Sequence, residues 1–135
     1  MPDTAILDED TGHSTWQSLE AVAVLPDPLA IPLEAWSTAR GLAIEQVRIP
    51  LGVVAVIYES RPNVTADSAV LCAKTGNATI LRGGSESINS NIAIAAALAR
   101  GGAKAGMPAD AIQLIPVTDR EAVRVMCEMD QFLDC

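Results

Sequence analysis

Apolar side chains in this chain of 135 residues gather in short runs, which alternate with polar and glycine-rich turns. Residues 51–58 are almost wholly apolar and rich in β-branched side chains, which is typical of a strand covered on both faces. Two further short runs, residues 78–81 and 111–117, predict two more strands. The mixed stretch 42–49, which Pro50 ends, predicts a partly exposed strand ahead of them.

Helical stretches separate the three apolar strands. Residues 63–75 are apolar nearly all round and follow Pro62, so they predict a buried helix that Gly76 ends. A second helix is expected after Gly84, with a buried side made of Ile88, Ile92 and residues 95–99. Its end contains two adjacent glycines, each of which weakens a helix by about 1 kcal/mol relative to alanine.

The front of the chain is less regular. Residues 1–17 show no clear period, and we expect them to be disordered. A short helix is expected over residues 18–25, before a turn with two prolines. Leu33 and Trp36 lie three positions apart, which predicts another brief helix that Gly41 ends.

The order of these elements predicts an α/β fold. A last helix should begin at the capping pair Thr118-Asp119 and run through Cys127, and residues 131–135 resemble the start of a fourth strand. Strands and helices that alternate in this way form right-handed βαβ crossovers and a parallel sheet. Ligands bind such sheets at the carboxyl ends of the strands, which here are residues 58–63, 82–86 and 116–119.

Composition narrows the class of protein. Half of the residues are apolar, yet the chain has only one Phe, one Tyr and two Trp, so aliphatic side chains must build the core of a single domain or a piece of one. A net charge of −8 argues against nucleic acid or an anionic membrane as the main partner. We expect no signal sequence, and no apolar run is long enough to span a bilayer.

The cysteines indicate a reducing compartment. Cys72, Cys127 and Cys135 are odd in number and lack CxxC spacing, so they predict neither a disulfide framework nor a metal site. Reduced thiols of this kind are typical of a cytoplasmic protein. None of the three has a histidine or a glycine-rich helix start close by in sequence, so we expect none of them to be catalytic.

The turn after the second apolar strand carries the clearest candidate chemistry. Its glycines allow close approach of a ligand, and the helix start that follows favours anions. Its carboxylate suits ribose hydroxyls, and its arginine suits a ribose phosphate. The same pattern is also that of an ordinary tight turn, because the GxGxxG fingerprint is absent. The residues of this candidate nucleotide-binding turn are Arg82, Gly83, Gly84, Ser85 and Glu86.

Asn63 admits two interpretations on spacing alone. At the start of a helix its side chain can satisfy local backbone groups. Its amide could instead donate to an oxyanion that develops during a reaction.

Residues 48–91 resemble the gamma-glutamyl phosphate reductase family, most specifically in YESRPN (58–63) and LRGGSE (81–86). The resemblance extends over about residues 18–134. This family lies within the aldehyde dehydrogenase superfamily and uses NADPH to reduce gamma-glutamyl phosphate to glutamate-5-semialdehyde and phosphate in proline biosynthesis. The resemblance therefore implies that residues 18–135 form a partial NADP-binding domain, with a partial Rossmann-like parallel sheet.

The resemblance also implies roles for single residues. Asn63 would help to form an oxyanion hole, Arg61 would meet the anionic substrate, and residues 82–86 would hold the adenosine ribose of NADP(H). The family's nucleophilic cysteine lies downstream of the matched stretch, so we expect the isolated chain to be inactive. The alternative is a non-catalytic fragment that binds nucleotide or another subunit. An incomplete sheet leaves an unpaired edge, so we expect marginal stability or association into a homo-oligomer.

Overall fold

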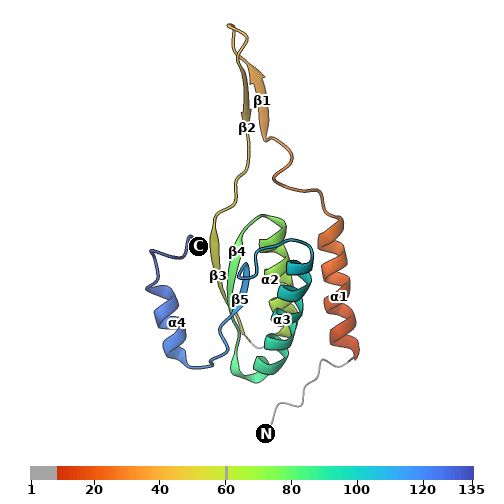
Figure 1. The fold of residues 1–135 in the computed structure, drawn as a ribbon, viewed down its shortest axis with the longest axis vertical. Helices are drawn as coiled ribbons and strands as arrows, with labels where there is room; N and C mark the ends of the chain where they lie inside the picture. The colour runs from red at the N-terminus through yellow and green to blue at the C-terminus, as the bar shows by residue number, and fades with distance from the viewer. Residues whose placement is uncertain (1–8, 60) are drawn as a thin grey trace.

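The computed structural model describes residues 9–59 and 61–135, and the expected disorder of residues 1–8 lies outside the described part. Helices cover both faces of a central parallel sheet, and a separate hairpin extends from its end (Figure 1). The elements in chain order are α1 (Glu9–Val24), β1 (Glu34–Ser37), β2 (Ala43–Gln46), β3 (Val53–Ile57), α2 (Pro62–Lys74), β4 (Ala78–Arg82), a 3-10 turn η1 (Ser85–Ser87), α3 (Ile88–Lys104), β5 (Ile112–Leu114) and α4 (Arg120–Cys127).

The central sheet has the strand order β3-β4-β5, and both pairings are parallel. Val53 lies opposite Ala78 at one end of the β3–β4 pair, and Ile57 lies opposite Arg82 at the other. Figure 1 shows α2 and α3 on one face of this sheet, with α1 beside α2, and α4 on the opposite face. The predicted α/β class with a parallel sheet is confirmed.

Local signals set the ends of α2 as predicted. Pro62 stands in the first turn, where its missing N–H is not needed. Thr75 ends the helix, and Gly76 follows it with φ +71°, a conformation that side chains other than glycine rarely adopt. A Cβ added at Gly76 would also lie 2.9 Å from Cγ of Pro50, so this position is closed to larger residues.

The core lies between the sheet and the pair α2–α3. Ala69 and Leu81 are fully buried there with Ile112. The predicted buried side of α3 is confirmed at Ala95 and wrong at Ile92, which is 39% exposed. Three of the four buried residues of α3 are small or polar, and the fourth is the aliphatic Ile94. The four are Ser90, Asn91, Ile94 and Ala95.

Helix α1 is longer than the sequence predicts. It begins at Glu9, so the expected disorder over residues 9–17 is wrong, although a helix over most of residues 18–25 is confirmed. Trp16 and Leu19 line an apolar groove together with residues of α2 and α3. Nζ of Lys74 donates to the carbonyl of Ala23 at 3.1 Å, which ties α2 to the last turn of α1. Packing therefore stabilises a helix whose own sequence period is weak.

The expected helix around Leu33 and Trp36 is a hairpin instead. The amide of Leu33 donates to the carbonyl of Gln46 at 2.7 Å, and Trp36 lies opposite Ile44 in an antiparallel register. Gly41, with φ +82°, lies in the connecting turn. The three-residue spacing is thus overridden by pairing with the next stretch of chain.

The end of the chain returns to the free edge of β3. The amide of Asp134 donates to the carbonyl of Val53 at 2.9 Å, and the amide of Ala55 donates to the carbonyl of Cys135 at 2.8 Å. The prediction that this segment approaches a fourth strand position is therefore confirmed. The chain runs from β3 outward through β4 to β5 and then returns by α4 to the other side of β3, so the strand order reverses at β3. In open α/β sheets, this reversal marks the crevice in which ligands bind.

No helix in the described part of the chain is both long and apolar enough to cross a membrane.

Two glycines with open surroundings give a test of the backbone. A Cβ added at Gly41 or at Gly101 would have no atom within 4 Å, but only Gly41 has a positive φ. We expect Gly101→Ala, inside α3, to raise the free energy of unfolding by about 1 kcal/mol. We expect Gly41→Ala to lower it by about 1–2 kcal/mol, because left-handed backbone disfavours a Cβ. Urea unfolding followed by circular dichroism measures both, and equal effects would contradict the assigned backbone.

A candidate nucleotide-binding pocket at the carboxyl edge of the sheet

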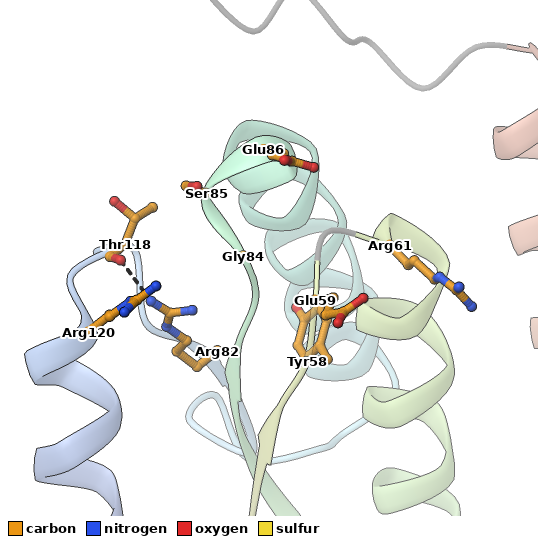
Figure 2. A pocket seen from close by; sticks show the side chains of 9 residues that line it. All are labelled: Tyr58, Glu59, Arg61, Arg82, Gly84, Ser85, Glu86, Thr118 and Arg120. Atoms are coloured by element: carbon orange, nitrogen blue, oxygen red, sulfur yellow. Dashed lines mark hydrogen bonds between the residues drawn. The ribbon is translucent and has the colours of Figure 1, made fainter.

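A cavity of about 580 Å³ lies at the carboxyl ends of the parallel strands (Figure 2). Each of the three loops that follow β3, β4 and β5 contributes to its wall, as the predicted strand ends require. The lining residues are Tyr58, Glu59, Arg61, Arg82, Gly84, Ser85, Glu86, Thr118 and Arg120.

The charge of this pocket is opposite to that of the whole chain. Three of the nine cationic residues line it, namely Arg61, Arg82 and Arg120, although the chain carries a net charge of −8. The carboxylates of Glu59 and Glu86 lie in the same wall. This combination suits a ligand that carries both anionic groups and hydroxyl groups.

Arg82 is the last residue of β4, and its guanidinium hydrogen-bonds to the loop that follows β5. Its Nη2 donates to the carbonyl of Thr118 at 2.7 Å and to that of Asp119 at 3.3 Å. Its Nε is buried and has no hydrogen-bond partner among the described residues. Arg82 therefore ties the end of β4 to the segment that begins α4.

The two glycines of the turn do different things. Gly83 is buried and does not line the pocket. A Cβ added there would lie 2.3 Å from Nδ2 of Asn91 and 3.0 Å from the ring of Tyr58, so Gly83 is required for packing beneath the turn. Gly84 does line the pocket and directly precedes the 3-10 turn that leads into α3.

A buried chain of hydrogen bonds holds the pocket's inner side together. The hydroxyl of Thr65 donates to Oδ1 of Asn91 at 3.0 Å, so it accepts from the hydroxyl of Tyr58 at 2.7 Å. Thr65 and Asn91 are fully buried. These bonds join the end of β3 to α2 and to α3, and they position the loops that carry the charged residues.

Arg61 and Asn63 lie at the start of α2. Arg61 is the residue before the first helical position, and Figure 2 shows its guanidinium pointing away from Arg82 and Arg120. Asn63 is half-buried, does not line the pocket, and makes no side-chain hydrogen bond with the described residues. No hydrogen bond among the described residues decides between the two interpretations of Asn63, so both its local capping role and its role as an oxyanion donor stay predictions.

Sequence reasoning missed Tyr58, Glu59, Thr118 and Arg120 as pocket residues. All four stand in or next to the strand-end loops that the sequence predicted, so the loops were found but these side chains were not. Arg120 follows the last expected loop residue, Asp119, whose carboxylate caps α4 by accepting from the amide of Glu121 at 2.9 Å. That cap is confirmed, and it turns the first residue of α4 toward the pocket.

Neither the cysteines nor a metal contribute to this site within the described residues. Cys72, Cys127 and Cys135 are free thiols, and none lines the pocket. No group of His, Cys, Asp and Glu among the residues that the structure describes could hold a metal ion.

The fold is similar to that of a solved aldehyde dehydrogenase. A solved structure of propionaldehyde dehydrogenase from Rhodopseudomonas palustris matches 90% of this chain with a TM-score of 0.65 at 16% identity, and the match covers 32% of that structure. At this identity the likeness shows the fold alone, and that fold is the partial Rossmann-like sheet of aldehyde dehydrogenases. No protein-family model matches the chain.

The similarity to gamma-glutamyl phosphate reductases is much closer. The reductase of Paramagnetospirillum magneticum is 49% identical over 134 residues, which are 99% of this chain and 32% of the relative. The crystal structure of the reductase of Thermotoga maritima matches with a TM-score of 0.88 at 36% identity, over 94% of this chain and 31% of that one. The resemblance predicted from YESRPN and LRGGSE is confirmed. The chain spans about a third of the length of the curated relatives that it matches.

Tyr58 allows the inner side of the pocket to be tested directly, because it is the only tyrosine in the chain. Burial raises the pKa of its hydroxyl above the ordinary value of 10.0. The unfolded chain then loses this proton first, so the free energy of unfolding should fall as pH rises above 10.0. Absorbance at 295 nm measures the titration. A midpoint at or below 10.0 in the folded chain would contradict the burial, and Tyr58→Phe should remove this part of the pH dependence.

Proposed function

We propose that this chain supplies the cofactor-binding part of an NADPH-dependent reductase, which converts gamma-glutamyl phosphate to glutamate-5-semialdehyde and phosphate. The observation that carries the proposal is the arginine- and glutamate-lined pocket at the carboxyl ends of three parallel strands. Its glycine turn, LRGGSE, is one of the two segments that most specifically resemble the reductases. The similarity over nearly the whole chain gives independent support.

The residues of the pocket fit NADP(H). Gly84 and Ser85 line the pocket just ahead of α3, where a helix start favours an anion. Glu86 offers a carboxylate for ribose hydroxyls, and the arginines offer cations for a ribose phosphate. Bound in this pocket, the nicotinamide cofactor would supply the hydride for the reduction.

The substrate roles follow from the start of α2. Asn63 would donate its amide to the carbonyl oxygen of the substrate as charge develops there. Arg61 would attract the anionic substrate, because its guanidinium is exposed and points outward from the cofactor side of the pocket. Free thiols and the absence of a membrane-spanning helix in the described residues support a cytoplasmic location.

The alternative hypothesis is that the chain is a non-catalytic module that binds nucleotide or another subunit. An apolar groove of about 580 Å³ between α1, α2 and α3 favours subunit binding, since it leaves Trp16 59% exposed. Both hypotheses retain the cofactor pocket. They differ in whether the protein catalyses turnover of the substrate.

Binding and turnover can be measured on the same preparation. We expect saturable binding of NADPH, followed by its fluorescence. We expect no NADP⁺ reduction at 340 nm with glutamate-5-semialdehyde and phosphate, because no cysteine lines the pocket. Absence of binding would contradict the proposed function. Turnover that is lost when Cys72, Cys127 or Cys135 is replaced by serine would contradict our assignment of these thiols.

A further inference from the structure

We infer that Arg120, and not Arg82, is the residue that contacts the phosphate on the adenosine ribose and so selects NADPH over NADH. This inference rests on the proposed function and names the specificity determinant of the same pocket. It follows from how the arginines are engaged within the described part of the chain.

Arg82 has little left to offer a phosphate. Bidentate recognition of a phosphate uses two neighbouring N–H groups of the planar guanidinium. Nη2 of Arg82 is engaged by the carbonyls of Thr118 and Asp119, and its Nε is buried. The guanidinium offers two such pairs, Nη1 with Nη2 and Nε with Nη2, and both include the engaged Nη2. Arg82 is therefore a positioning residue, which fixes the segment that carries Arg120.

Arg120 is placed where an isolated cation is unfavourable. It is the first residue of α4, and the positive end of a helix dipole disfavours a nearby cation. Its side chain is exposed and makes no hydrogen bond or ion pair with the described residues. An anion in the pocket would meet both the guanidinium and the helix start. It would offset the unfavourable interaction between this cation and the helix dipole.

Another arginine of the same helix shows the contrast. Arg124 is held by ion pairs with Glu121 and Glu128 on the outer surface of α4. It does not line the pocket, whereas Arg120 does. Arg124 is thus a matched control, with the same side chain and charge one turn further along.

The neighbours of Arg120 fit a phosphate monoester on a sugar. Figure 2 shows Arg120 on the same side of the pocket as Arg82 and Thr118, while Arg61 lies on the other side. Ser85 and Glu86 complete the wall of this pocket with a hydroxyl and a carboxylate. In the arrangement that we infer, the ribose would bond to Glu86 and its phosphate would meet Arg120.

The test compares two probes on the 135-residue chain by isothermal titration calorimetry. Adenosine 2′,5′-bisphosphate carries the ribose phosphate, and AMP lacks it. We expect Arg120→Gln to weaken binding of the bisphosphate by about tenfold or more, which is the usual loss for one charge-assisted contact. Binding of AMP should change by less than about twofold, and Arg124→Gln should leave both affinities unchanged within the same limit.

Arg82→Gln separates positioning from contact. We expect it to lower the melting temperature and to weaken both probes, whereas Arg120→Gln should not lower the melting temperature and should raise it slightly, because it removes a cation from a helix start. An unchanged ratio of the two affinities in Arg120→Gln, with both probes still bound, would overturn the inference and leave the proposed function standing. If the wild-type chain binds neither probe, both the inference and the proposed function fail.

Discussion

A connected series of hydrogen bonds among three side chains holds the carboxyl edge of the sheet in one arrangement. Tyr58, Thr65 and Asn91 belong to the end of β3, to α2 and to α3, and two of them are fully buried. A buried polar group that loses its partner costs about 1–3 kcal/mol, so these elements cannot shift independently. Gly83 fits against the same group. The loops of the pocket are therefore positioned by packing before any ligand arrives.

Most of the fold could be predicted because its signals are local. The β-branched run of β3, Pro62 before α2, Gly76 after it and Asp119 before α4 each act within a few residues of their position. The first part of α1 could not be predicted in this way. Its stability depends on a groove built by helices that come some fifty or more residues later in the chain. The hairpin was missed for a similar reason, because pairing decides between two local readings of Leu33 and Trp36.

The position of the anion-binding turn could be predicted from the sequence, but the role of each arginine in the pocket could not. The sequence places Arg82 beside two glycines and a carboxylate, which is sufficient to indicate an anion-binding turn. It does not reveal that Thr118, far along the chain, accepts a hydrogen bond from that guanidinium. The role that we infer for Arg120 depends on that hydrogen bond, which engages Arg82 elsewhere. Periodicity and motif spacing therefore contain no signal for Arg120. Gly83 shows the same limit, because its packing role depends on Asn91.

The reversal of strand order at β3 gives the pocket a direction. The charged groups suited to an adenosine ribose come from the loops after β4 and β5, whereas Arg61 and Asn63 follow β3. An extended dinucleotide bound across the strand ends would therefore place its adenosine half over β4 and β5 on the proposed function. Its reactive half would point toward the carboxyl end of β3, after which Arg61 and Asn63 follow. On the proposed function, cofactor selection and chemistry would thus be separated along one sheet edge, so a change at Arg120 would alter the first without reaching the second.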